Sequence, residues 1–220
     1  MTRRPARALT ALSLTAAVVA ASAGTASAER WWGGDLSGDV QQVGFSPEPP
    51  PCGTVRQSAA PQDAATDIVG LSVRHEEDTV DVRVQFWDLT PLWEDRRLTL
   101  DLETDRRDYQ ITIQRWRERG PLETTVAVAP RAPEEVDECG TYYTVQLIVP
   151  CPDLLMTRSP DREVVSIILP RTCVGGPRWV RAGARNYRTV QDRFRSDVWG
   201  TSGLDPVAYT GPFGTRVRHD

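Results

Sequence analysis

Residues 80–86 read Val-Asp-Val-Arg-Val-Gln-Phe, with apolar and polar side chains in strict alternation. In an extended strand a two-residue period places the valines and Phe86 on one face and the polar side chains on the other. The same alternation recurs at residues 98–103 and 109–114, and turn-forming residues such as 104–108 separate the runs. These runs therefore predict strands that bury only one face.

The rest of the chain continues this pattern. Residues 90–94 could form at most one helical turn, with Thr90 as its N-cap and Pro91 in the first position. About eight or nine short strands and no long helix predict an all-β fold, an antiparallel β-sandwich of immunoglobulin-like or jelly-roll-like type. The further strands are expected near residues 122–129, 141–149, 153–158, 163–170 and 178–188.

The N-terminus is typical of an exported protein. Three arginines within residues 3–7 precede an apolar stretch at 8–23, and Ala26-Ser27-Ala28 forms a small-residue cleavage motif. Hydroxyl side chains interrupt the apolar stretch, which is shorter than the roughly 20 residues that a membrane-spanning helix needs. We therefore expect residues 1–28 to be a secretory signal peptide, and the mature protein to be secreted without a membrane span.

Composition divides the remaining residues into three parts. Residues 29–65 are rich in Gly and Pro and are interpreted as an N-terminal arm that is loose or associated with a sheet edge. Residues 66–199 are expected to form the β-sandwich domain, and residues 200–220 a loosely ordered tail. The whole chain has a net charge of −4; residues 1–28 contain three arginines and no acid, so their removal leaves −7. This acidic balance argues against a nucleic-acid partner.

In an exported protein the even number of cysteines predicts two disulfides. A strand at 142–149 would hold Cys139 and Cys151 too far apart to bond to each other. A turn at 159–162 would fold 153–158 against 163–170 and bring Cys151 close to Cys173, which leaves Cys52 for Cys139. The alternative, Cys52–Cys151 with Cys139–Cys173, follows if 142–149 pairs directly with 163–170. The four cysteines are Cys52, Cys139, Cys151 and Cys173.

Residues 164–183 read Val-Val-Ser-Ile-Ile-Leu-Pro-Arg-Thr-Cys-Val-Gly-Gly-Pro-Arg-Trp-Val-Arg-Ala-Gly. This stretch resembles a strand followed by Pro-Arg-x-Cys-Leu-Gly and Pro-Arg-Trp-Val-Arg in small secreted proteins of high-GC actinobacteria. Those proteins also carry an Asp-Ile strand that ends in His and a Val/Arg strand that ends in Asp-Leu, which here are residues 67–75 and 80–89. Val174 stands where Leu is usual, and Cys52 and Cys139 lie outside the pattern. The resemblance spans residues 66–185 and implies a secreted β-sandwich without specifying an activity.

Two sets of side chains are candidate sites. Four carboxylates surround one predicted hairpin and could bind Ca²⁺, although Arg106 and Arg107 would repel a cation and a solvated hairpin tip is the favoured alternative. Trp116, on the polar side of its strand, could present a flat face to a sugar ring or a peptide, or stack on neighbouring arginines. The four carboxylates are Asp101, Glu103, Asp105 and Asp108.

A row of arginines near the C-terminus has two interpretations. It could attract an anionic polymer such as a teichoic acid, or the arginines could pair with carboxylates of a neighbouring strand, which we favour. The row consists of Arg178, Arg181, Arg185, Arg188, Arg193 and Arg195.

The sequence contains no recognisable catalytic set or cofactor motif. His75 precedes two glutamates, His219 lies in the tail, and Ser202 is not in a Gly-x-Ser-x-Gly context. We therefore predict a secreted, disulfide-stabilised, non-catalytic binding or envelope-associated module without a cofactor or metal, whose ligand is an extracellular glycan or protein. The alternatives are a secreted protease inhibitor that presents residues 172–175 or 130–139, and, less favoured, a hydrolase.

Overall fold

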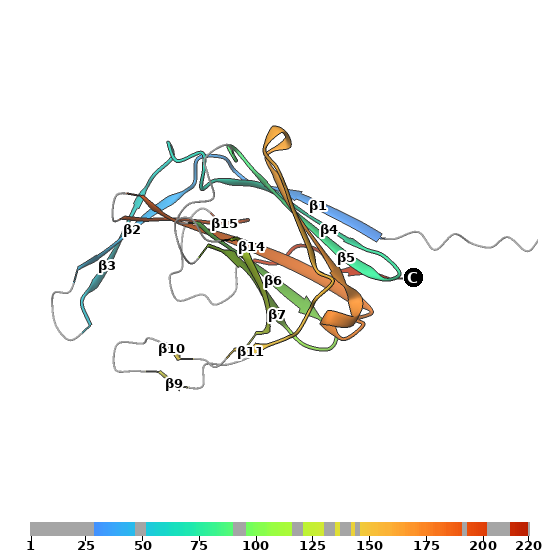
Figure 1. Cartoon of the computed structure of the whole chain (residues 1–220). Coiled ribbons are helices and arrows are strands. Elements are labelled where there is room, and N and C mark those ends of the chain that lie inside the picture. Colours follow the sequence, from blue (N-terminus) through green and yellow to red (C-terminus); the bar gives the residue numbers. More distant parts are fainter. Residues whose placement is uncertain are drawn as a thin grey trace, which may run out of the picture.

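The alternating runs of the sequence form two antiparallel sheets that pack face to face (Figure 1). The computed structural model describes residues 29–46, 52–89, 96–115, 121–129, 135–136, 142–143, 146–190, 193–201 and 212–219. Within these ranges the chain contains strands and two short 3₁₀ turns, η1 (Pro160–Arg162) and η2 (Arg171–Val174), and no α-helix. The prediction of an all-β sandwich is confirmed. The signal peptide and the helical turn predicted at 90–94 lie outside the described residues.

One sheet has five strands, all antiparallel to their neighbours. The hairpin of β4 and β5 forms its centre, and β13 and β12 continue it on one side. In order across the sheet the strands are β1 (Glu29–Gly34), β4 (Ile68–His75), β5 (Thr79–Phe86), β13 (Val164–Pro170) and β12 (Leu155–Ser159).

The other sheet has nine strands and is curved (Figure 1). A short strand, β16 (Val217–Arg218), pairs with β14, and β9 (Glu135–Val136) and β10 (Tyr142–Tyr143) form a separate pair. The other eight strands are, in order, β11 (Leu147–Ile148), β8 (Glu123–Val128), β7 (Tyr109–Gln114), β6 (Arg96–Thr104), β14 (Trp179–Val190), β15 (Arg193–Val198), β2 (Gln41–Ser46) and β3 (Thr54–Ala59).

The core lies between the two sheets and is built from the alternating apolar positions. In β5 the side chains of Val80, Val82, Val84 and Phe86 are fully buried, while Arg83 between them is exposed. The facing positions of β6, β7, β13 and β14 are also apolar and buried. Each fully buried aliphatic or aromatic side chain of this size contributes about 1.5–3 kcal/mol to folding, so the alternation identified in the sequence supplies the main stabilisation of the sandwich.

The N-terminal arm is part of the sandwich, which corrects the predicted domain boundary at residue 66. β1 forms the edge of the five-stranded sheet, and β2 and β3 extend the nine-stranded one. Trp31 anchors β1 because its ring packs on the core and meets Trp199 edge to face at 5.3 Å. A side chain at Gly33 would lie within 2.7 Å of the Trp31 ring, so this glycine leaves the space that the ring occupies. Association with a sheet edge, one of the two predicted states of the arm, is therefore correct.

The C-terminal tail is also docked where it is described, contrary to the loosely ordered tail that we predicted. Residues 212–219 follow β14: Gly214 donates a hydrogen bond to the Ala182 carbonyl, and Val217 is buried. The Arg216 guanidinium stacks over the Trp179 ring at 4.2 Å. These contacts hold a Gly- and Pro-containing segment in place.

With the arm and short edge strands included, the described residues contain sixteen strands, more than the eight or nine predicted.

The disulfide Cys151–Cys173 is confirmed, with its Cα atoms 5.5 Å apart. Leu155 of β12 pairs with Ile168 of β13, the register that brings the two cysteines together. The alternative pairing of Cys52 with Cys151 is therefore wrong. Cys52 also takes part in a disulfide, and its predicted partner, Cys139, lies outside the described residues.

Candidate functional site

Three of the four carboxylates of the predicted calcium hairpin bind arginines that lie in β14 or directly before it. Asp101 and Arg185 form a two-point ion pair with both N–O distances at 2.9 Å, and Asp105 accepts a hydrogen bond from the Arg178 Nε at 3.0 Å. Glu103 accepts from Arg181 in the same way. The antiparallel register of β6 and β14 produces the Asp101–Arg185 and Glu103–Arg181 pairs, and Asp105 and Arg178 meet just beyond the ends of these strands. The hairpin therefore holds guanidinium groups where we had considered a cation, and the predicted pairing of the arginine row with a neighbouring strand is confirmed for these arginines.

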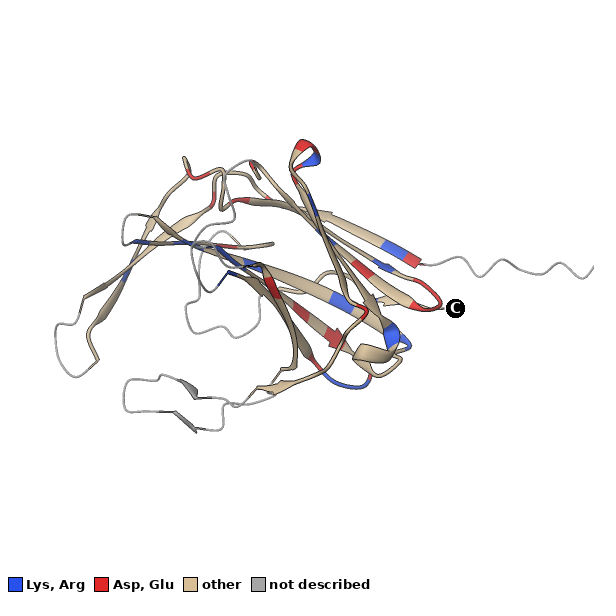
Figure 2. Ribbon diagram, in the orientation of Figure 1, with Lys and Arg blue, Asp and Glu red and all other residues tan. Residues whose placement is uncertain are grey.

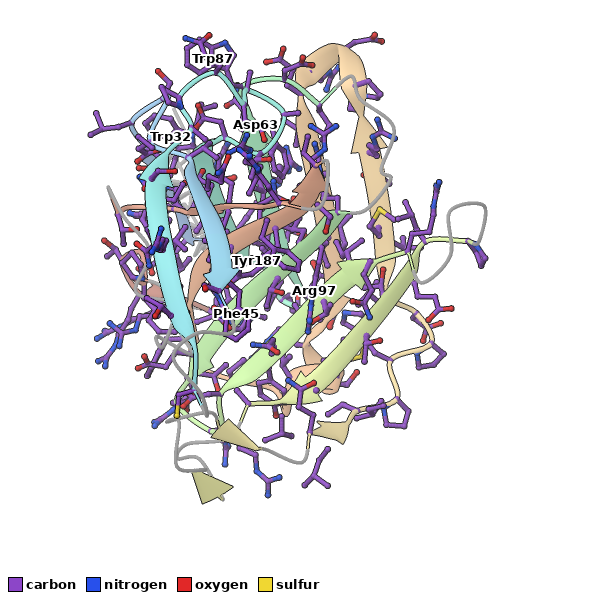
Figure 3. The ribbon with its side chains drawn as sticks, turned by 90° about the vertical axis from the view of Figure 1, so that its left-hand side faces the viewer. Trp32, Phe45, Asp63, Trp87, Arg97 and Tyr187 are labelled. Carbon is purple, nitrogen blue, oxygen red and sulfur yellow. A yellow bond between two sulfur atoms is a disulfide. The ribbon has the colours of Figure 1, made fainter. Side chains whose placement is uncertain are left out.

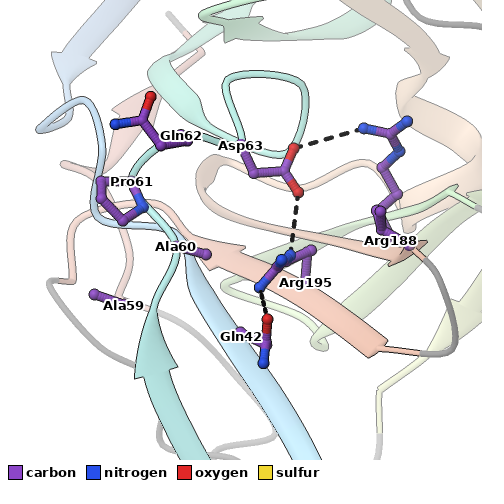
Figure 4. Close-up of a pocket in the computed structure, with 9 residues that line it drawn as sticks. Gln42, Ala59, Ala60, Pro61, Gln62, Asp63, Arg188 and Arg195 are labelled. Carbon is purple, nitrogen blue, oxygen red and sulfur yellow. Dashed lines mark hydrogen bonds and ion pairs between the residues drawn. The ribbon is translucent and has the colours of Figure 1, made fainter.

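Two further arginines of the row share one carboxylate. Asp63 lies 3.5 Å from Arg188 and 3.7 Å from Arg195, measured between charged N and O atoms (Figure 4). These groups line an open hollow of about 430 Å³ beside the end of β3. Across the molecule, acidic and basic residues are interspersed (Figure 2). This distribution weakens the case for a polyanion as the ligand.

An apolar patch lies on the outer face of the nine-stranded sheet, where three strands meet. Val43 of β2 faces Phe194 of β15, and Phe45, two residues further along β2, faces Val55 of β3. Residues opposite each other in antiparallel strands share a face, so these four side chains are neighbours. The exposed fractions are 65% for Phe45, 55% for Phe194 and 49% for Val55. We call these four residues the apolar patch.

Polar side chains with planar groups border the apolar patch on the same face. The registers place Gln41, Gln57 and Tyr187 on this side of the sheet, and Arg97 lies opposite Tyr187. Figure 3 shows Phe45, Tyr187 and Arg97 over this face. Together they offer hydrogen-bond donors and acceptors beside exposed aromatic rings.

Three aspartates that are distant in the sequence converge between the sheets. Asp39 precedes β2, Asp67 precedes β4 and Asp197 lies in β15, and one carboxylate oxygen of each lies within 4.8 Å of the others. We call these three residues the aspartate cluster. Sequence analysis missed it because no local motif contains two of its members.

Burial and mutual repulsion alter the acidity of the aspartate cluster. Burial raises the pKa of Asp197 to about 8, although a hydrogen bond from the Ile68 amide opposes this shift. The pKa of Asp39 is raised to about 6 by burial and by the neighbouring charge of Asp35. Burial also raises the pKa of Asp67. Charge on these carboxylates is therefore costly unless a positive group compensates it.

The other predicted sites give a mixed result. Trp116 lies outside the described residues, as does most of the 130–139 segment. Residues 172–175 belong to the 3₁₀ turn η2 and its cap, and Val174 is fully buried. This segment therefore does not present the extended backbone that an inhibitory loop inserts into a protease.

His75 is a core residue. Its side chain is fully buried, its Nδ1 lies 3.3 Å from the Val217 carbonyl oxygen, and its ring centroid lies 5.5 Å from that of His219. The pKa of His75 is lowered, mainly by burial and further by the nearby charges of Arg171 and His219, against an opposing effect of the Val217 hydrogen bond. This histidine therefore stays neutral in the folded chain at neutral pH.

The lowered pKa of His75 predicts a contribution to acid sensitivity. The unfolded chain takes up a proton at this histidine below pH 6.5, whereas the folded chain does so only at lower pH. The stabilisation by neutral His75 is therefore fully present above pH 6.5 and is lost as the pH falls. We expect the unfolding free energy of the wild type, relative to that of His75→Gln, to fall by up to about 1.4 kcal/mol per pH unit below pH 6.5. Urea unfolding of both proteins at pH 5.0, 6.0 and 7.5 measures this difference, and a difference independent of pH contradicts the prediction.

No helix in the described part of the chain has the length and apolar character needed to cross a membrane. The chain matches no protein-family model, and no curated protein or solved structure matches it at a significant level. Its function is therefore inferred from its own residues and their geometry.

Proposed function

We propose that the protein is a non-catalytic binding module that acts outside the cell or at the cell envelope, and that the apolar patch and its polar border bind an envelope glycan. The observation that carries this proposal is the exposure of Phe45, Val55 and Phe194 side by side on one sheet face. Large exposed apolar groups that cluster in this way mark interaction surfaces in soluble proteins. The signal-like N-terminus and the Cys151–Cys173 disulfide support action in an oxidising compartment.

A glycan fits this surface better than a purely apolar partner. One face of a sugar ring carries C–H groups that pack on an aromatic ring, while its hydroxyls need planar donors and acceptors at the ring edge. Phe45 and Phe194 supply the rings, and Gln41, Gln57 and Arg97 supply amide and guanidinium groups on the same face. The curvature of the sheet lets several strands face one extended ligand (Figure 1).

Replacing both aromatic rings should abolish most of the binding. For Phe45→Ala/Phe194→Ala we expect at least a tenfold loss of affinity for insoluble cell-wall polysaccharide, because each ring lost removes about 1–2 kcal/mol of contact. Trp32→Ala is the matched control, since this aromatic is 62% exposed but lies on the outer face of the other sheet. Co-sedimentation with purified polysaccharide and with an extract of envelope proteins measures both variants. Equal binding by the double variant, or binding to envelope proteins alone, contradicts the proposal.

A further inference from the structure

The aspartate cluster has the geometry of a cation site. Oxygen atoms that coordinate one Ca²⁺ at about 2.4 Å lie at most about 4.8 Å apart, and the three carboxylates of Asp39, Asp67 and Asp197 meet this limit. Asp67 and Asp197 are almost completely buried. Among the described residues, no arginine forms an ion pair with any of the three, in contrast to Asp63, Asp101 and Asp105.

The carboxylates are held in place while some of their oxygen atoms remain unused. The Gly38 amide donates to Asp67 Oδ2 at 2.6 Å, and the Ile68 amide donates to Asp197 Oδ2 at 2.6 Å. Asp67 Oδ1 and both oxygens of Asp39 are buried and have no hydrogen-bond partner among the described residues. Buried carboxylate oxygens without a partner are costly, so these oxygens favour a bound cation.

A neutral oxygen next to the aspartate cluster is also without a partner. Asn186 lies directly opposite Asp197 in the β14–β15 ladder, is fully buried, and donates from its Nδ2 to the Thr66 carbonyl. Its amide oxygen, Oδ1, has no hydrogen-bond partner in the described part of the chain. Amide oxygens, like carboxylate oxygens, are ligands for Ca²⁺. This fully buried oxygen indicates a bound cation independently of the acidic side chains.

One member of the aspartate cluster, Asp39, borders a hollow at the surface. This hollow of about 460 Å³ is also lined by Asp35, Leu36 and residues 200–201. Asp35 adds a fourth carboxylate in this hollow, where it accepts hydrogen bonds from the Leu36 and Gly200 amides. The hollow is therefore acidic, and it adjoins the aspartate cluster at Asp39.

From these contacts we infer that Asp39, Asp67 and Asp197, with the amide oxygen of Asn186, bind one Ca²⁺. The ion joins three parts of the fold: the crossing from β1 to β2, the start of β4 in the five-stranded sheet, and β15 in the nine-stranded sheet. Ca²⁺ is favoured over Mg²⁺ because a site made mostly of protein oxygens at these separations suits its longer bonds, whereas Mg²⁺ retains several waters. The ion thus has a structural role, distinct from ligand binding by the apolar patch.

Calorimetric titration of the purified, chelator-stripped protein with CaCl₂ and with MgCl₂, followed by thermal unfolding, tests this site. We expect one Ca²⁺ per chain with a dissociation constant of about 10⁻⁴ M or tighter. At one hundred times that constant, the thermal midpoint should rise by about 5–10 °C. Absence of both the binding heat and the midpoint shift, or an equal response to Mg²⁺, overturns the assignment.

Two conservative variants and one control locate the ion. Asp39→Asn and Asp67→Asn should each weaken Ca²⁺ binding at least tenfold, because each removes a charged ligand, and Asp153→Asn, an exposed aspartate outside the cluster, should leave it unchanged. Both cluster variants should unfold in chelator at or above the wild-type temperature, since removal of one of several like charges relieves repulsion. Retention of the calcium response in both cluster variants overturns the inference. Phe45→Ala/Phe194→Ala should keep the response, so the proposed glycan binding can fail separately.

Discussion

Arg185→Leu should lower the unfolding free energy by about 3–5 kcal/mol, the cost of leaving a buried charge without its partner. Asp101 is almost completely buried and accepts both guanidinium hydrogen bonds of Arg185. Without the arginine, its one remaining side-chain donor among the described residues is the Gln110 amide, which does not neutralise its charge. For a chain of this length the loss corresponds to a fall of about 10 °C in the thermal midpoint, measurable by circular dichroism together with urea unfolding.

Two further variants separate the buried charge from other effects of the substitution. Arg178→Leu removes an arginine of the same row whose side chain is 83% exposed, so it should cost less than about 1 kcal/mol. Asp101→Leu/Arg185→Leu removes both charges and should recover most of the stability, because a buried pair replaced by apolar side chains is often close to neutral. If Arg185→Leu lowers the unfolding free energy no more than Arg178→Leu does, the Asp101–Arg185 pair is not a desolvated ion pair.

The fold was predictable because its main signal is local. The alternation in residues 80–86 is enough by itself to predict that Val80, Val82, Val84 and Phe86 share one buried face. All four are buried in the structure. The arm was underestimated for the opposite reason. Trp31 is anchored by Trp199, near the other end of the chain, and a Gly-rich strand shows too little alternation to reveal such a contact.

The candidate sites were less predictable than the fold, because they depend on which strands are neighbours. The arginine row could be interpreted from the sequence, since Asp101 and Glu103 recur with a two-residue period on one face of β6 and Arg181 and Arg185 lie on one face of β14. Asp39, Asp67 and Asp197 carry no such signal, since each is a single acid in an ordinary context. Only the crossing of the chain from β1 to β2 brings Asp39 to the other two. The apolar patch likewise depends on β2 pairing with β15, a contact between distant segments.

Replacing both cysteines of the Cys151–Cys173 disulfide should lower the unfolding free energy by about 3 kcal/mol, the loop-entropy value for a bridge of this span. The bridge closes a loop of 22 residues that contains the β12–β13 hairpin. Without it the unfolded chain gains conformations, while Val174, buried next to Cys173, still holds η2 on the core. Cys151→Ser/Cys173→Ser avoids a free thiol and, unlike a reductant, leaves the Cys52 disulfide in place. Chemical unfolding of the variant and the wild type measures the difference. A loss below about 1 kcal/mol contradicts the prediction and would mean that residual structure already restricts this segment in the unfolded chain.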